Sequence, residues 1–405
     1  MQELDDNLRD LLVHLASHWR LIVGLSAATL AGAVLFAWSG VYSVAATSGH
    51  YPFFRLFLSF ALDKSVAAHT VGIRIPAEVL EDPGAVRRGA GHYQGGCAPC
   101  HGAPGEARNP IARRMLPEPP YLGDRIRDWS PEELFWIVRH GIKYAGMPSW
   151  VAPERDDEVW AVVAFLRHLP QMEPAAYRRL AFGEIGSATE GVAEGVSLLL
   201  MNGPAGNGIA ACGRCHGADG LGGESGAFPR LVGQSEAYLR AALQAYALGT
   251  RPSGIMQPVA AELAAEEINA LAAHYAVQPV PSDSGDGPET ATLSLGRRIA
   301  EEGRPDRGVA ACTACHGGTS RHPLIPRLEG QHAGFVSSQL ELWMRGVRGG
   351  GSGDVFARIM AYGVGIDPRR PPAKESHWPL SPAEIRAVAA WYATQPLPAD
   401  AVARR

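Results

Sequence analysis

Three copies of one short motif contain every cysteine of the 405-residue chain. The copies read Cys97-Ala-Pro-Cys100-His101, Cys212-Gly-Arg-Cys215-His216 and Cys312-Thr-Ala-Cys315-His316. No cysteine is left over for a structural disulfide, a zinc cluster or a nucleophile. In each copy, two thiols three positions apart project to the same side of a helical turn, and the imidazole that follows extends from the same segment. The motif therefore predicts a group that is held by two sulfur atoms and one ring nitrogen.

A methionine follows each motif at a similar distance. Met147, Met256 and Met360 stand 46, 40 and 44 residues after the histidine of their copy. Cysteines with this spacing form thioethers to haem c, the adjacent histidine binds the iron, and a methionine on the opposite face completes six-coordination. We therefore expect three covalently bound haems. The expected attachment residues are Cys97, Cys100, Cys212, Cys215, Cys312 and Cys315, and the expected iron ligands are His101, Met147, His216, Met256, His316 and Met360.

Other chemistry is open to a single copy of the motif, which could be a redox-active dithiol or half of a zinc site. Three copies, each with a trailing methionine, favour haem. Two other methionines compete as ligands. Met115 lies only 14 residues after His101, and Met344 lies in an apparent helix over Ser338–Arg345, where packing in the core is favoured.

A proline lies between each motif and its methionine, within a Pro-x-Leu triplet. The three triplets begin at Pro120, Pro229 and Pro326. A proline carbonyl can accept the N–H of the ring nitrogen that does not bind the metal, which sets the tautomer and orientation of the imidazole. We expect this role for all three prolines because they occupy the same place in each copy.

Helices must position these groups, since each copy shows the same helical pattern and no alternating strand pattern. Opening helices are expected from about Asp82, Thr189 and Leu293, and each methionine is expected in a loop. Closing helices carry apolar residues at intervals of three and four. The closing helices are expected over Glu158–Phe165, Glu267–Tyr275 and Glu384–Tyr392. The fold class is therefore all-α, with three tandem repeats.

The predicted organisation follows from these repeats. The first repeat covers residues 81–172, the second 188–280 and the third 292–398, with a polar linker at 281–291 and a looser connection over about 171–188. Before them we expect a cytoplasmic tail at 1–20, a transmembrane helix at 21–46 and a juxtamembrane segment at 47–80.

The segment 21–46 contains no charged side chain. Twenty such residues in a helix already cover about 30 Å, the thickness of the hydrocarbon core of a bilayer. A cleaved signal peptide is the alternative, since Val44-Ala-Ala46 resembles a cleavage site, but the length of the run and the acidic residues before it favour a retained anchor. The aromatic run over 51–62 is too short to span; it either lies along the membrane surface or packs under the first repeat.

The net charge of the chain and the compartment in which haem is attached limit the functions that it can have. A formal charge of −4 without basic patches argues against binding to nucleic acid. Haem is attached to such motifs outside the bacterial cytoplasm, so the repeats should be periplasmic, tethered to the inner membrane by one N-terminal span.

From about residue 190 to 398 the chain resembles the diheme cytochrome c-four family. The resemblance is carried by Cys212–Gly220, Phe228–Gln234 and Ile255-Met256, and in the third repeat by Cys312–Gly317, Pro326–Gln331 and Ile359-Met360. Residues 85–170 resemble a further class I cytochrome c domain. The resemblance implies three helical domains with His/Met haems that transfer single electrons. The anchor, the extra domain and an insertion at Gly363–Leu380 depart from that family.

With both axial positions filled, no iron offers a site for a substrate, so we expect an electron carrier and not an enzyme. The expected donor is a quinol-oxidising complex or a dehydrogenase, and the expected acceptor is a haem–copper terminal oxidase or a soluble cytochrome. An alternative is the cytochrome subunit of a membrane-bound alcohol or sugar-acid dehydrogenase. A peroxidase or thiosulfate dehydrogenase is disfavoured, because it would need an open or a cysteine- or lysine-ligated iron.

Overall fold

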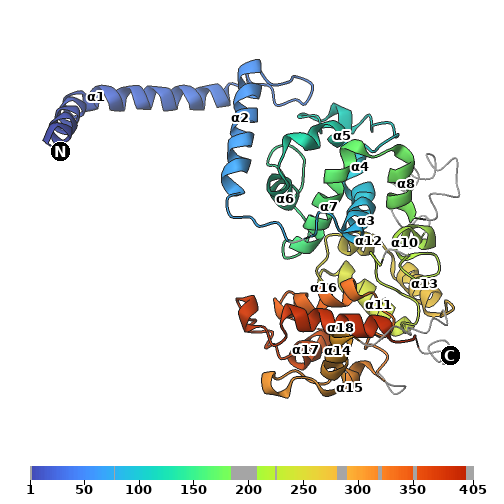
Figure 1. The fold of residues 1–405 in the computed structure, drawn as a ribbon. Helices are drawn as coiled ribbons and strands as arrows, with labels where there is room; N and C mark the ends of the chain where they lie inside the picture. The colour runs from blue at the N-terminus through green and yellow to red at the C-terminus, as the bar shows by residue number, and fades with distance from the viewer. Residues whose placement is uncertain are drawn as a thin grey trace. The chain divides into compact units, whose positions relative to one another are not determined.

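The computed structural model describes residues 2–76, 78–183, 208–223, 226–280, 290–317, 322–349 and 354–397. The chain divides into two compact units, one of residues 1–59 with 114–116 and the other of residues 60–113 with 117–405. All regular elements in the described ranges are helices (Figure 1). The only β contacts there are three isolated bridges. The prediction of an all-α chain is confirmed.

The first helix, α1 (Gln2–Trp38), contains the apolar segment. Its part from Ser17 to Trp38, 22 residues with a mean hydropathy of 2.0, is long and apolar enough to cross a membrane. The predicted limits differ from these: the helix continues through the expected tail and stops well before residue 46. It ends there because Gly40 adopts a left-handed φ of +66°. A signal sequence meets the same criteria of length and composition, so a retained anchor stays a prediction.

Helix α2 (Pro52–His69) contains the aromatic run. Phe53 and Leu56 are exposed in its first half, whereas Val66 is fully buried in its second half. The ring of His69 lies 5.4 Å from that of Trp136. The second half of α2 therefore packs on the first repeat, whereas the first half keeps its apolar side chains exposed.

The first repeat is built from short and medium helices. They are α3 (Pro83–His92), the π-helix η1 (Tyr93–Cys97), α4 (Ala98–His101), η2 (Ala112–Arg114), α5 (Leu122–Arg125), η3 (Ile126–Asp128), α6 (Pro131–His140), α7 (Asp156–His168), η4 (Leu169–Gln171) and α8 (Pro174–Phe182). Helices α3 and α7 cross at close range, because a Cβ on Gly89 would lie 2.1 Å from the carbonyl oxygen of Ala161. Only glycine permits this approach of two backbones.

Helix α8 corrects the predicted boundary of the first repeat. The segment was expected to be a loose connection beyond residue 172, but Tyr177, Ala181 and Phe182 are buried in the same core as Tyr93 and Phe165. The hydroxyl of Tyr177 also donates to the side-chain carbonyl of buried Gln94. Apolar burial at intervals of four and five residues thus makes α8 part of the first repeat.

The second and third repeats contain the remaining helices. In the second they are α10 (Gly208–His216), α11 (Glu236–Ala247), α12 (Met256–Ala261) and α13 (Ala265–Ala276). In the third they are α14 (Ala291–Glu302), η7 (Pro305–Arg307), α15 (Thr313–His316), α16 (Ala333–Met344), α17 (Val355–Gly363), η8 (Glu375–His377) and α18 (Pro382–Thr394). The expected opening helix near Thr189 lies outside the described residues.

The third repeat has the same close helix crossing as the first. Helices α14 and α18 cross where a Cβ on Gly296 would lie 2.1 Å from the carbonyl oxygen of Ala387. Buried apolar side chains form a separate cluster in each repeat: a large one around Phe165, a second around Met344 and a small one around Leu239. The buried members of each cluster therefore come from a single repeat.

Two of the three methionines are not in loops, contrary to expectation. Met147 lies in a turn, but Met256 is the first residue of α12 and Met360 lies inside α17. Helix α17 begins early because the carboxylate of Asp354 accepts hydrogen bonds from the backbone N–H groups of Phe356 and Ala357.

Candidate haem-binding sites

Each motif histidine contacts the carbonyl of its predicted proline. The Nδ1 atom lies 2.9 Å from the Pro120 oxygen at His101. The corresponding distances are 3.0 Å from His216 to Pro229 and 2.9 Å from His316 to Pro326. A carbonyl oxygen can only accept, so Nδ1 carries the proton and donates it. The Nε2 atom is therefore the unprotonated nitrogen in all three repeats, which is the form that binds a metal.

The surroundings of two of these histidines also favour the neutral ring. Burial lowers the pKa of His101 below its usual value, although the carbonyl of Pro120 partly opposes the shift. Burial has the same effect on the pKa of His216. An uncharged imidazole at neutral pH is what iron ligation requires, since the ligand nitrogen must be free of its proton.

The first cysteine of each motif is a poor candidate for a reactive thiol. Burial raises the pKa of Cys97 to about 12, and that of Cys212 and Cys312 to about 11. A redox-active dithiol needs a lowered pKa, because the thiolate is the nucleophile. All six thiols are free of disulfides. Two thiols beside a neutral imidazole whose Nε2 carries no proton fit covalent attachment of a haem.

The predicted methionine ligands are all half-buried. The carbonyl of Met147 accepts a hydrogen bond of 3.1 Å from the N–H of Ile142, which closes the turn that contains Met147. Met344, the competitor in the third repeat, is fully buried in the core, as its position in a helix predicted. The other competitor, Met115, is half-buried in the segment 114–116. Ligation by Met147, Met256 and Met360 stays a prediction.

Comparison with known proteins decides the family. A profile of the cytochrome c oxidase, cbb3-type, subunit III family matches residues 84–166. The chain is 36% identical over 163 residues to the thiosulfate dehydrogenase electron acceptor of Stutzerimonas stutzeri, covering 40% of this chain and 76% of that protein. It is 32% identical over 170 residues to cytochrome c4 of Azotobacter vinelandii, covering 39% of this chain and 79% of that protein. The chain belongs to the cytochrome c family.

A solved structure of cytochrome c4 from Acidithiobacillus ferrooxidans matches 45% of this cytochrome and 98% of its own chain, with 28% identity and a TM-score of 0.36. Membership of the family implies covalently bound haem c at the Cys-x-x-Cys-His motifs. Each of the three motifs of this cytochrome contains two cysteines and a histidine that could hold such a haem.

Two glutamines join the second and third repeats of this cytochrome. Gln234 follows the Pro229 triplet and Gln331 follows the Pro326 triplet, in the common sequence Pro-Arg-Leu-x-Gly-Gln. Gln331 donates to the carbonyl of Arg230 at 2.9 Å and accepts from its N–H at 2.9 Å. Sequence reasoning assigned no role to these residues. The repeated Gly-Gln, which is missing after Pro120, was the available signal.

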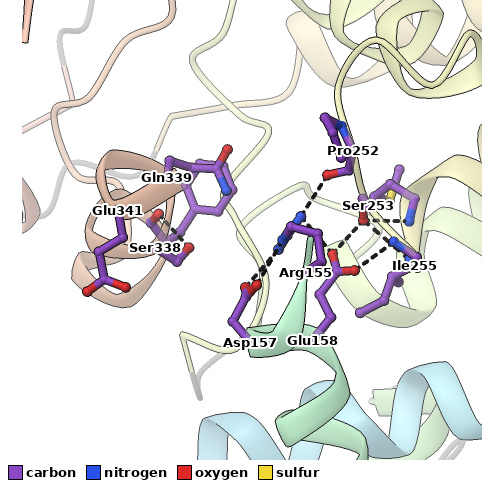
Figure 2. Close-up of polar contacts among 12 residues, drawn as sticks. Arg155, Asp157, Glu158, Pro252, Ser253, Ile255, Ser338, Gln339 and Glu341 are labelled. Atoms are coloured by element: carbon purple, nitrogen blue, oxygen red, sulfur yellow. Dashed lines mark hydrogen bonds and ion pairs between the residues drawn. The ribbon is translucent and has the colours of Figure 1, made fainter. Parts of the chain in front are cut away.

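A second group that sequence reasoning missed lies between the first and second repeats (Figure 2). Arg155 and Glu158, at the start of α7, bind the segment Pro252–Ile255 that precedes Met256, and Asp157 binds Arg155. The charged residues were visible in the sequence, but nothing in their spacing indicated a partner about 95 residues away.

Proposed function

We propose that this cytochrome is a periplasmic, membrane-tethered protein that relays single electrons between redox partners through three covalently bound haems. The observation that supports the proposal best is the histidine arrangement. In all three repeats, Nδ1 donates to a proline carbonyl, so Nε2 is the ring nitrogen that lacks a proton, as iron ligation requires. An arrangement found once could be a coincidence of a loop, whereas three copies indicate one repeated cofactor site.

Haem, when bound, supplies an iron that accepts and releases one electron. The cysteines of each motif would hold the group in place through thioethers, and the histidine would bind its iron. In the proposal, Met147, Met256 and Met360 would be the second ligands, and a sulfur ligand of this kind raises the reduction potential. With a histidine and a methionine of the chain as ligands, the iron would have no position left for a substrate. The residues therefore favour transfer of electrons over catalysis.

The proposed route leads from a quinol-oxidising complex or a dehydrogenase to a haem–copper terminal oxidase or a soluble cytochrome. The match of residues 84–166 to a subunit of a cbb3-type oxidase supports the acceptor. Thiosulfate dehydrogenase is a second candidate donor, because this cytochrome resembles the electron acceptor of that enzyme over 76% of the relative's length. In the second case the chain receives electrons from the enzyme and does not itself oxidise thiosulfate.

A mass spectrum of the mature chain tests the cofactor part of the proposal. Three covalently added haems per chain are expected, and any smaller number would contradict it. The route is tested by following haem reduction in the oxidised, purified full chain. One arm adds thiosulfate and thiosulfate dehydrogenase, and the other adds quinol and a quinol-oxidising complex. Fast reduction in only one arm identifies the donor, and reduction in neither arm would contradict both routes.

A further inference from the structure

The segment that leads into Met256 is held by side chains of the first repeat (Figure 2). The guanidinium of Arg155 donates to the carbonyl of Pro252 at 2.9 Å. The carboxylate of Glu158 accepts from the hydroxyl of Ser253 and from the N–H of Gly254, each at 2.6 Å. Three successive residues of the second repeat are thus bound by two residues at the start of α7.

Ser253 connects Glu158 to the backbone of Met256 through hydrogen bonds. Its hydroxyl donates its single proton to Glu158, and its oxygen accepts the N–H of Met256 at 3.0 Å and that of Ile255 at 3.3 Å. One donor and two acceptor sites are the full capacity of a hydroxyl group. Two consecutive hydrogen bonds therefore connect Glu158 with the backbone of Met256 at the beginning of α12.

The charges in this cluster are buried and paired. Only 6% of Glu158, 7% of Arg155 and 2% of Ser253 is exposed. Arg155 forms an ion pair of 2.8 Å with Glu158 and binds both carboxylate oxygens of Asp157 at 2.9 Å. A buried charge without a partner is strongly unfavourable, so removal of any member disturbs the others. The cluster therefore has little freedom to rearrange.

Close packing supports the same contact. A Cβ on Gly254 would lie 2.2 Å from Nε1 of Trp150, so only glycine fits at this position. The indole N–H of Trp150 also points at Glu158, with a distance of 3.4 Å to its carboxylate. The backbone of the second repeat thus lies directly on an aromatic side chain of the first.

The equivalent glutamates of the other repeats have a different role. Glu158, Glu267 and Glu384 are each the third residue of a closing helix. Glu267 accepts the N–H of Ala264 at 2.8 Å, and Glu384 accepts that of Ser381 at 2.9 Å, so both cap their own helix. Glu158 instead binds the segment before a methionine of another repeat.

The other two methionines are supported from within their own repeats. Asp354 caps the helix that contains Met360, and Ile142 binds the carbonyl of Met147. We infer that Arg155 and Glu158 are positioning residues for Met256, so that the first repeat controls axial ligation and reduction potential at the second haem. This inference rests on the proposed function, in which Met256 binds the second iron.

The experiment compares variants of the full-length, haem-loaded chain. Glu158→Ala and Ser253→Ala remove the connection, and Ser253→Thr keeps the hydroxyl. Glu267→Ala is the matched control, because Glu267 has the same place in a closing helix but does not contact the Met256 segment. Met256→Ala is the reference for complete loss of the ligand. The readouts are the sulfur-to-iron charge-transfer band, a potentiometric titration and binding of carbon monoxide to the reduced chain.

For Glu158→Ala and Ser253→Ala we expect one of three redox components to move to lower potential. The charge-transfer band should fall by up to the amount lost in Met256→Ala, and carbon monoxide binding should rise toward one molecule per chain. Ser253→Thr and Glu267→Ala should match the unaltered chain. Since Ser253→Ala removes a single oxygen atom, it provides the test if Glu158→Ala fails to fold.

Two results would overturn the inference, and they differ in what else they affect. If both alanine variants keep the band and all three potentials while Met256→Ala loses one component, the positioning role is wrong and the haem assignment stands. If Met256→Ala itself leaves the band unchanged, Met256 is not the ligand, and that part of the proposed function fails as well.

Discussion

Gln234 and Arg327 exchange two hydrogen bonds across the boundary between the second and third repeats. The side-chain amide of Gln234 donates to the Arg327 carbonyl at 2.8 Å, and the Arg327 N–H donates back at 2.9 Å. Gln331 and Arg230 repeat the exchange in the opposite direction. Each arginine directly follows the proline whose carbonyl holds a motif histidine. The same loops therefore orient the histidines and join the two repeats.

We expect Gln234→Ala and Gln331→Ala each to lower the free energy of unfolding by about 1–3 kcal/mol, because each leaves a half-buried peptide group without its partners. The loss in the double variant should be smaller than the sum, since both pairs lie in one interface. Urea unfolding measures the effect. The control is Gln171→Ala, because Gln171 is exposed, and this variant should change the free energy of unfolding by less than about 0.5 kcal/mol. A loss in either glutamine variant no larger than in this control would argue against the interface.

Replacement of each predicted methionine ligand should open one iron. In the reduced chain, Met147→Ala, Met256→Ala and Met360→Ala should each bind one carbon monoxide, as followed by absorbance, while the unaltered chain binds none. Met344→Ala should bind none either, although it should cost about 2–5 kcal/mol of stability through a cavity in the core. Stoichiometric binding at all three centres of the unaltered chain would contradict the predicted ligation.

Acid should weaken the third repeat through Glu384. Hydrogen bonds from Arg307 at 2.6 and 3.0 Å hold the pKa of this carboxyl at about 2, below its usual value of 4.5. A group whose pKa is lower in the folded state stabilises the fold above the unfolded pKa, and this contribution is lost as the pH falls through the folded pKa. The loss should therefore develop between pH 4.5 and about 2.

Unfolding of Glu384→Gln as a function of pH checks this assignment. The variant should be less stable by about 1–3 kcal/mol at neutral pH, and its stability should decline less than that of the unaltered chain below pH 4.5. Parallel declines in the two proteins would show that another carboxyl is responsible.

The N-terminal helix should remain on the mature protein. Intact mass measurement of chain purified from membranes should include residues 1–46 as well as the haems, because the 22-residue apolar segment is long enough to span a bilayer. Alkaline extraction of the membranes should leave the chain in the pellet. A mature chain that begins near residue 47 and is recovered in the soluble fraction would instead identify the segment as a cleaved signal sequence.

The sequence by itself determined the cofactor chemistry and the helical class. The Cys-x-x-Cys-His motif needs only five consecutive residues, and the periodic apolar positions of the closing helices depend on local geometry. For the same reason, the closing helices α7, α13 and α18 include the ranges predicted for them. The prolines were expected to contact the histidines because three copies shared one order, and the contact is present in each repeat.

Only the tertiary structure decided how these parts support one another. The sequence of helix α8 predicted a loose connection, but in the structure Tyr177 is buried in the core beside Tyr93. Glu158 occupies the same helical position as Glu267 and Glu384, yet it accepts hydrogen bonds from a neighbouring repeat, where they accept a backbone N–H of their own helix end. A carboxylate accepts from whichever N–H or hydroxyl group comes within reach, and the fold alone brings Ser253 to Glu158 from 95 positions away.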